Sequence, residues 1–207
     1  MVWGTRMIVS FDEDSLVAAA RAGDFRRVLE PKTHMIEAIR ASPSLKEGEP
    51  REVLRQLSEA AVRLLGVQRV GIWALDDAFT KLTCLELMES ESGRHSSGTT
   101  ITRTEAPHYF GLVMAAEVVT IDDALGDPRT AELARNYLPA FGIAALLDCP
   151  ILIERRIAGV LRAEHVGGTR RWQGWERLLG STFAECAGVA IGLARGASSS
   201  TWRRLAG

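Results

Sequence analysis

Four aspartates in the second half of the chain are the first candidates for chemistry, because carboxylates can hold a metal ion or act as an acid–base pair. They are Asp122, Asp123, Asp127 and Asp148. Asp122 and Asp127 precede segments with turn and helix patterns, where an aspartate side chain accepts hydrogen bonds from free backbone N–H groups. Capping and turn roles therefore explain these aspartates better than a metal site does.

Two arginines, Arg129 and Arg135, flank these aspartates. A guanidinium group in this position either pairs with the carboxylates or presents its donors to an anionic ligand. The ion pair is the simpler interpretation, and a ligand contact through Arg129 is the alternative.

The histidines form no zinc site by spacing. Glu164 and His165 end a predicted strand, so their side chains point to opposite faces and cannot act together on one substrate without a bend. His165 alone could ligate haem or another metal, but a hydrogen bond to a loop is the commoner role. His34, His95 and His108 lack the short spacing to each other or to a cysteine that zinc sites show, which excludes structural zinc.

Nucleophilic catalysis finds no support in the sequence. Ser97 lacks the strand–turn–helix frame of a hydrolase serine, and no glycine-rich phosphate loop follows a strand. The three cysteines, Cys84, Cys149 and Cys186, are odd in number and far apart, which is typical of reduced, buried thiols in a cytoplasmic protein. We therefore predict a protein that is not an enzyme; a redox role for Cys84 or Cys149 would require the two thiols to be close.

The composition is that of an ordinary globular protein. Of 207 residues, 46% are hydrophobic and 25% are charged, which is enough for one domain with a core and an extension. The formal net charge of −1 argues against a broad surface for nucleic acid or anionic membrane. We expect no signal peptide, and no apolar run approaches the ~20 residues of a membrane span.

Two segments define the architecture that must position these side chains. The apolar runs Gly142–Ile153 and Ile157–His165 are separated by only three residues, which predicts a hairpin of long strands. Arg51–Leu65 carries apolar residues at three- and four-residue spacing, follows Pro50 and precedes Gly66, which predicts a helix.

The remaining segments predict an antiparallel sheet with helices on its faces. Strands are expected at Arg69–Leu75, Leu82–Met88 and Val118–Ile121, and helices at Glu105–Ala115, Pro128–Leu138 and Trp175–Ala194. The polar stretch Glu89–Thr104 is expected to be a mobile loop. Because the hairpin strands are almost continuously apolar, both sheet faces must be covered, and the fold class is α/β (α+β).

The last predicted helix contains Gly188 and Gly192, four residues apart. A glycine destabilises a helix interior by ~1 kcal/mol, so a closely packed partner is expected. That partner is the sheet of the same domain, which we favour, or a second subunit, because the apolar stripe of this helix is close to a heptad pattern.

The chain divides into four regions. They are a helical extension at 1–41, a breaker-rich linker at 42–50, the main domain at 51–195 and a flexible tail at 196–207. Helical pieces are expected from Asp12 to Gly23, from Asp24 to Pro31, where proline interrupts or restarts the helix, and over Lys32–Ala41. The extension has too little bulk for a core of its own, so we predict a homodimer that uses residues 16–39 together with the final helix.

Six short motifs, spread from the segment before the long hairpin to the end of its second strand, give the chain a family resemblance. They are Asp122-Asp123-Ala124, Asp127-Pro128-Arg129, Tyr137-Leu138, Asp148-Cys149-Pro150-Ile151, Gly159-Val160-Leu161 and Glu164-His165. In this order the chain between Arg51 and Ala194 resembles the GAF domains of bacterial sensor proteins. The resemblance implies a central antiparallel sheet of about five to six strands, with the N- and C-terminal helices on one face and short helices and loops roofing a pocket on the other.

The resemblance also implies a function, because GAF domains typically bind small molecules or dimerise and mostly catalyse nothing. It implies a regulatory sensor module that signals through its terminal helices to a fused or separate kinase or cyclase, whether the chain stands alone or is a fragment. The ligand and any cofactor stay unidentified. The cysteine cluster of methionine sulfoxide reductases, the cysteine anchor of bilin-binding members and the Asn-Lys-Phe-Asp-Glu set of cyclic-nucleotide-binding members are all absent from the sequence.

The predicted ligand site combines the roof and the floor of that pocket, with Glu105–Ala115 and Pro128–Leu138 as the roof. The ligand-binding candidates are Trp73, Glu86, Tyr109, Phe110, Arg129, Tyr137, Leu146 and Arg162. The aromatic residues, with Trp172, could equally form a core. Arg129 and Tyr137 would lie two turns apart on one helix. A cavity between sheet and roof would favour the sensor, whereas a filled one would favour the alternative, a dimerisation scaffold that binds no ligand.

Overall fold

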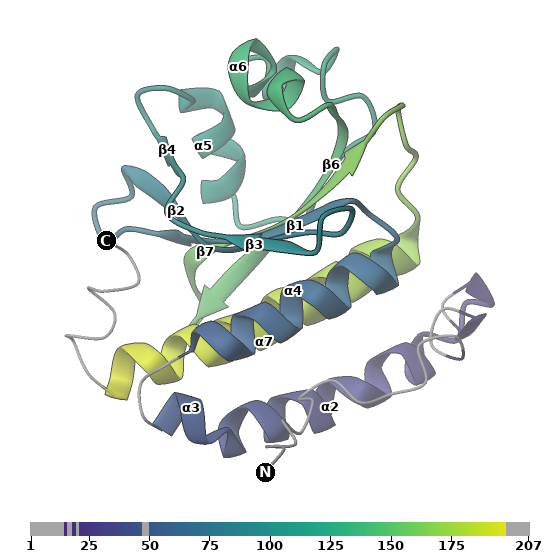
Figure 1. Cartoon of the computed structure of the whole chain (residues 1–207), viewed down its shortest axis with the longest axis vertical. Coiled ribbons are helices and arrows are strands. Elements are labelled where there is room, and N and C mark those ends of the chain that lie inside the picture. Colours follow the sequence, from purple (N-terminus) through teal and green to yellow (C-terminus); the bar gives the residue numbers. More distant parts are fainter. Residues whose placement is uncertain (1–14, 16–17, 20, 47–49, 198–207) are drawn as a thin grey trace.

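A computed structural model describes residues 15, 18–19, 21–46 and 50–197. Its helices are α2 (Phe25–Ala41), α3 (Pro43–Lys46), α4 (Arg51–Leu65), α5 (Pro107–Met114), the 3-10 helix η1 (Pro128–Thr130), α6 (Leu133–Ala140) and α7 (Gly174–Ala197). They form layers around one sheet: α4 and α7 cover one face, α5 and α6 cover the other, and α2 and α3 lie beyond α4 and α7 (Figure 1).

Among the described residues the sheet has seven strands, and neighbouring strands pair antiparallel throughout. The strands are β1 (Arg69–Leu75), β2 (Lys81–Glu89), β3 (Arg94–Ser96), β4 (Thr100–Thr102), β5 (Val119–Ile121), β6 (Ile143–Ile153) and β7 (Arg156–Val166). Their order is β3-β2-β1-β7-β6-β5, and β4 also pairs with β2. The predicted long hairpin, β6–β7, is confirmed and lies inside the sheet rather than at its edge.

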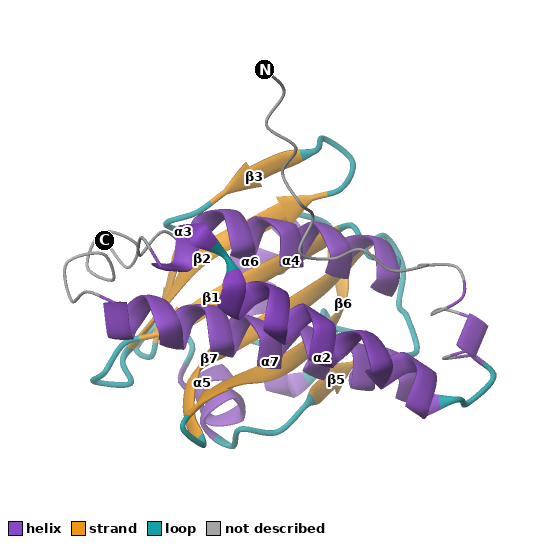
Figure 2. Ribbon diagram, turned by 90° about the horizontal axis from the view of Figure 1, so that it is seen from below, coloured by secondary structure: helices purple, strands orange, loops and turns teal. Residues whose placement is uncertain are grey.

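Helices α4 and α7 pack side by side on one sheet face, as the sequence predicts (Figures 1 and 2). The apolar residues of α4 are buried, and Gly66 ends the helix in the left-handed conformation, φ 59°. The glycines of α7 allow a close approach to the sheet: a Cβ added at Gly188 would lie 2.7 Å from the carbonyl oxygen of Leu152. The close partner expected for this helix is therefore the sheet of the same chain.

Helix α2 packs along α7 on the side away from the sheet (Figure 2). Met35 and Ile39 of α2 and Leu45 of α3 are buried in the same apolar cluster as α4 and α7. The prediction that Pro31 breaks the extension is wrong, because α2 is continuous through it. Packing on α7 offsets the one backbone hydrogen bond that proline removes. Half of the residues of the helix expected from Asp12 to Gly23 lie outside the described residues, as do 1–11 and 198–207.

Two predictions about the other face also need correction. The helix expected over Pro128–Leu138 is divided into η1 and α6, although Asp127 caps its start as predicted, with Oδ1 accepting from the Arg129 N–H at 2.8 Å. The stretch expected to be a loop, Glu89–Thr104, contains β3 and β4. These short strands form because the edge of β2 offers unpaired backbone groups to the chain that returns beside it.

One described helix, spanning 174–196 within α7, is long and apolar enough by composition to cross a membrane. This differs from the expectation that no run would be long enough. In the fold the helix packs against β6, β7 and α4, and α2 covers its outer side, so its apolar residues are those of a core helix.

Candidate functional site

The face of the sheet beneath α5 and α6 buries charged side chains among aromatic ones. Alternation along β1 directs Arg69, Gly71 and Trp73 toward this face, which we call the roof face. It directs the residues between them toward α4 and α7, on the side that we call the helix face. On β7 the same alternation directs Arg162 and Glu164 toward the roof face. The side chains of these residues other than glycine are all buried: Arg69, Trp73, Arg162 and Glu164.

The first charged cluster joins Arg162, Asp148 and Tyr109. Asp148 and Arg162 are direct cross-strand partners on β6 and β7. The guanidinium of Arg162 donates from Nε to Asp148 Oδ1 at 3.0 Å and from Nη2 to Asp148 Oδ2 at 3.1 Å. The two groups therefore form a bidentate ion pair. The hydroxyl of Tyr109, on α5, donates to the same Oδ2 at 2.7 Å.

The second cluster repeats this arrangement one strand over. Arg69 on β1 is the cross-strand partner of Glu164 on β7, and its Nε donates to Glu164 Oε2 at 2.7 Å. The hydroxyl of Tyr137, on α6, donates to Glu164 Oε1 at 2.6 Å. Arg69 also pairs with Glu89, and the Phe141 ring lies 4.2 Å from its guanidinium carbon. The chain has only two tyrosines, and each links one roof helix to one buried carboxylate.

The protonation states in these clusters follow from burial and from the neighbouring charges. Burial, together with the nearby carboxylate, raises the pKa of Tyr109 and of Tyr137 above the ordinary value, so both hydroxyls stay protonated as donors. Burial alone would lower the pKa of Arg162, but Asp148 and the two tyrosines outweigh it and the pKa is raised. Arg162 is therefore a permanent cation inside the protein.

Aromatic rings surround that cation. The guanidinium carbon of Arg162 lies 4.4 Å from the ring centre of Tyr109 and 5.9 Å from those of Trp73 and Tyr137. Phe110 and Leu146 belong to the same buried cluster. The structure thus brings six of the eight predicted site residues together, namely Trp73, Tyr109, Phe110, Tyr137, Leu146 and Arg162. Trp172 instead packs with the helix-face core and donates its Nε1–H to the Ile121 carbonyl.

The comparisons with known proteins decide the family. The model of the GAF domain family matches residues 49–191. The chain belongs to the GAF domain family. No curated protein matches it.

Solved structures share the fold of this GAF domain at low sequence identity. A methyl-accepting chemotaxis protein fragment, residues 122 to 287, has 22% identity and a TM-score of 0.64, over 79% of this chain and 98% of that one. The phycoerythrobilin-bound GAF domain of a cyanobacterial phytochrome has 18% identity and a TM-score of 0.61, over 90% and 98%. A domain of a putative two-component sensor histidine kinase from Sinorhizobium meliloti 1021 has 20% identity and a TM-score of 0.53, over 70% and 92%.

Glu86 of this GAF domain does not face the roof, contrary to prediction. A bulge opposite Ile72 and Trp73 inserts one extra residue, Leu85, into β2. Leu85 and Glu86 therefore both lie on the side of α4, where Ser58 Oγ donates to Glu86 Oε1 at 3.4 Å and His95 contacts the same carboxylate. Strict alternation from Leu82 would have placed Glu86 on the roof face.

Arg129 also lies apart from the other candidates. Its side chain is 47% exposed, and its guanidinium pairs with Asp127 and donates to the Thr120 carbonyl at 3.2 Å. Because η1 and α6 are separate helices, Arg129 and Tyr137 do not share one helix face as predicted. These contacts match the simpler interpretation of Arg129 as an ion-pair partner.

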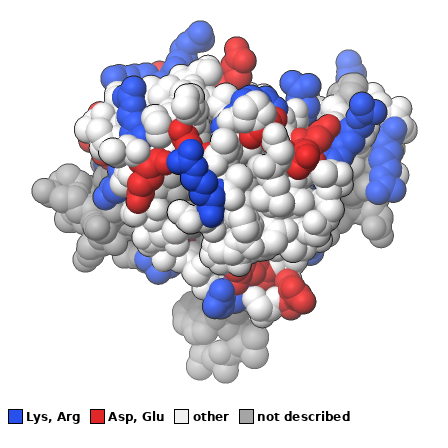
Figure 3. All heavy atoms as spheres, turned by 90° about the horizontal axis from the view of Figure 1, so that it is seen from above, with Lys and Arg blue, Asp and Glu red and all other residues white. Residues whose placement is uncertain are grey.

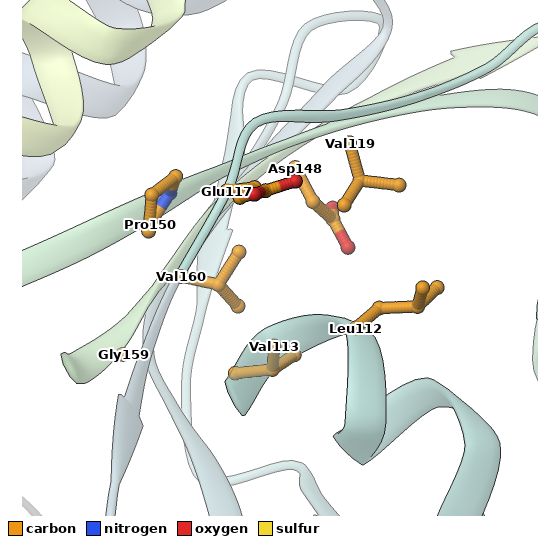
Figure 4. A pocket seen from close by; sticks show the side chains of 8 residues that line it. All are labelled: Leu112, Val113, Glu117, Val119, Asp148, Pro150, Gly159 and Val160. Atoms are coloured by element: carbon orange, nitrogen blue, oxygen red, sulfur yellow. The ribbon is translucent and has the colours of Figure 1, made fainter. Parts of the chain in front are cut away.

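The space between sheet and roof in this GAF domain is almost filled. A cavity of about 10 Å³ lies between α5 and the sheet, beside Val113, Asp148 and Val160 (Figure 4). A wider open hollow of about 530 Å³ lies at the end of α6, between Phe141, Arg69 and Arg94. Seen from the roof side, the charges on the surface are interspersed in sign (Figure 3).

The cysteines of this GAF domain are buried, and none forms a disulfide. Cys84 lies in the roof-face cluster, whereas Cys149 and Cys186 lie in the helix-face cluster. Burial raises the pKa of each thiol to about 12. Because Cys84 and Cys149 lie on opposite faces of the sheet, the geometry gives no support to a redox pair.

His165 points to the helix side of the sheet, opposite to Glu164, as its position in the strand predicts. Its Nδ1 has no hydrogen-bond partner within the described part of the chain. Burial, and then Arg170, lower the pKa of this imidazole. The hydrogen bond to a loop that the sequence predicts for this histidine is therefore not made through Nδ1 within the described residues.

Arg69 and Glu164 belong to this site but are not among the residues predicted for it, and the pairing of Asp148 with Arg162 was not predicted either. A signal for them exists. In neighbouring strands of a hairpin, opposite charges at every second position of otherwise apolar runs point to cross-strand ion pairs on one face. Arg162 and Glu164, two residues apart in the apolar strand β7, fit that pattern.

Proposed function

We propose that this GAF domain is a sensor module that binds a small molecule between the sheet and the roof helices α5 and α6. The observation that carries the proposal is the pair of buried Arg–carboxylate–Tyr clusters beneath these helices. Buried ion pairs are often no more stabilising than apolar residues of the same volume. Their concentration on one face is therefore better explained by recognition than by stability.

The clusters also provide a route for the signal. Each roof helix contacts a buried carboxylate through one hydroxyl, Tyr109 on α5 and Tyr137 on α6. A ligand that competes for either carboxylate or for Arg162 would loosen that contact and shift the helix. Arg162 lies between Leu161 and Ala163, which pack into the core beneath α4 and α7, so a movement of β7 would reach both long helices.

The structural neighbours support the class of function but not the ligand. One neighbour is described as a phycoerythrobilin-bound GAF domain, and two others come from a chemotaxis protein and a putative sensor histidine kinase. A role in signalling, with a kinase or cyclase as the fused or separate output, is the proposal that fits these neighbours.

Hydrogen exchange with mass spectrometry tests the proposal. The full chain is incubated with the low-molecular-weight fraction of a cell extract, and native mass spectrometry of the same sample reports any bound mass. We expect a discrete added mass and amide exchange at least about tenfold slower in α5 and α6, with α4 unchanged, as for a ligand at about ten times its Kd. An added mass without protection of the roof, or no added mass, would contradict the proposal.

A second candidate, a dimerisation scaffold without ligand, is favoured by one observation: the cavity beneath the roof measures only about 10 Å³. Its interface would use residues 16–39 together with α7. In the chain itself, however, α7 already covers the buried side of α2 through Met35 and Ile39, so the extension does not need a second subunit to bury these residues. Light scattering of the full chain and of a chain that begins at Ser42 separates the candidates, and two monomeric results would exclude the scaffold.

A further inference from the structure

Two buried donors on the roof face have no acceptor. Trp73 Nε1 and Arg162 Nη1 are fully enclosed nitrogen atoms without a hydrogen-bond partner among the described residues. Both side chains are 1% exposed. An enclosed polar group without a partner costs free energy comparable to a lost hydrogen bond, and so such groups are uncommon in folded proteins.

The two donors lie in one place. Gly71 and Arg162 are direct cross-strand partners, and a Cβ added at Gly71 would lie only 2.5 Å from Trp73 Nε1. The indole N–H therefore occupies the space above Gly71, next to the base of the Arg162 side chain. The guanidinium carbon of Arg162 lies 5.9 Å from the centre of the Trp73 ring. One acceptor placed between the two side chains could use both donors.

The charge of the site selects the kind of acceptor. Asp148 already neutralises Arg162 through two hydrogen bonds, and Glu164 and Glu89 together neutralise Arg69 and Arg94. A buried anion would add negative charge without a free cation to compensate it, which is costly in an enclosed site. A neutral carbonyl oxygen accepts two hydrogen bonds without that cost.

We infer that this GAF domain recognises its ligand by a neutral carbonyl oxygen, of an amide, lactam or ketone, that accepts from Arg162 Nη1 and Trp73 Nε1. The inference rests on the proposed function and names the chemistry of its ligand. The rings of Trp73, Tyr109 and Tyr137 surround the Arg162 guanidinium, and aromatic rings are common in sites that take flat organic groups. The alternative occupant is a single water molecule, whose oxygen can accept from both donors.

Acetamide and acetate form a matched pair of probes, because they have nearly the same shape and differ in charge. The full chain, labelled with ¹⁵N, is titrated with each probe over the millimolar range, and the indole N–H signals are followed by NMR. We expect acetamide to shift the Trp73 signal saturably and acetate to bind at least about tenfold more weakly. The Trp172 signal is the internal control, because its N–H already donates to the Ile121 carbonyl at 3.3 Å and should not move.

Two variants assign the donors. Trp73→Phe keeps the buried ring and removes the N–H, and Arg162→Lys keeps the charge opposite Asp148 and removes Nη1. Each should weaken acetamide binding about tenfold, read from the backbone amide of Gly71, whereas Arg94→Lys on the exposed edge should leave it unchanged. If Arg162→Lys does not fold, Trp73→Phe alone decides.

The outcomes separate this inference from the proposed function. Equal or tighter binding of acetate, or unchanged acetamide affinity in Trp73→Phe, would overturn the carbonyl inference. If neither probe moves the Trp73 signal while an extract ligand protects α5 and α6 from exchange, the donors hold water only and the inference fails, although the sensor proposal stands. If the extract also leaves the amide exchange of α5 and α6 unchanged, both the carbonyl inference and the sensor proposal fail.

Discussion

The two faces of the sheet are packed by different chemistry. Toward α4 and α7 the centre of the interface is a continuous cluster of aliphatic side chains with Phe183, reinforced by α2 and α3 from outside. Toward α5 and α6 the aliphatic and aromatic side chains enclose two ion pairs and two unsatisfied donors. The first face has what a stable core needs. The second face has buried polar groups, which stabilise less than an apolar core and to which the proposed function assigns ligand recognition. We expect this face to open more easily.

The largest effect should come from the helix face. Phe183→Ala removes a fully buried ring from the cluster between sheet and helices, and we expect the free energy of unfolding to fall by about 3–5 kcal/mol. Urea denaturation measures it. Leu193→Ala on the same helix is the control, because this side chain is 41% exposed and its loss should cost less than about 1 kcal/mol. Similar small losses in both variants would mean that this face does not carry the stability.

Breaking an ion pair on the roof face should have the next largest effect. Asp148→Ala leaves Arg162 buried without its partner, and we expect a loss of about 3 kcal/mol or more in the free energy of unfolding. The double change Asp148→Leu with Arg162→Met should restore stability to within about 1 kcal/mol of the original, because apolar residues of similar volume replace both charges. A double variant as unstable as the single one would show that the charges are structural, which would remove the distinction between the faces.

The tyrosine contacts should have the smallest effect on stability. Tyr137→Phe and Tyr109→Phe each remove one hydroxyl donor to a buried carboxylate, and we expect a loss of about 1.5–3 kcal/mol for each. Hydrogen exchange locates the effect: exchange should accelerate in α6 for Tyr137→Phe and in α5 for Tyr109→Phe, with α4 and α7 unchanged. Acceleration spread evenly over the whole sheet would show that the roof helices do not move independently.

Much of this fold is predictable from local patterns. Helix α4 follows from three- and four-residue apolar spacing with Gly66 at its end, and the β6–β7 hairpin follows from two long apolar runs with a short break. The errors occur where neighbours in space override the local pattern. Pro31 stays helical because α2 packs on α7, and β3 and β4 form because β2 has an open edge.

The site was predictable only in part, for the same physical reason. The aromatic residues and Arg162 follow from their places on predicted strands and roof helices, and the structure brings them together. The face of Glu86 depends on a single-residue bulge that no periodicity reveals. The contact between Arg69 and Glu164 joins residues 95 positions apart, and it depends on the pairing of β1 with β7, which the order of strands in the sequence does not specify.

The claim that the roof opens independently of the helix face is tested most directly by the three cysteines, which serve as built-in reporters. Cys84 lies on the roof face, and Cys149 and Cys186 lie on the helix face, all buried with a pKa of about 12, so labelling near pH 8 requires local opening. A thiol reagent is applied to the native full chain, and mass spectrometry of its peptides gives the labelling rate of each cysteine. We predict that Cys84 is labelled at least about tenfold faster than the other two, through openings that do not unfold the helix face. Equal rates for all three cysteines, at the rate of global unfolding, would contradict the account.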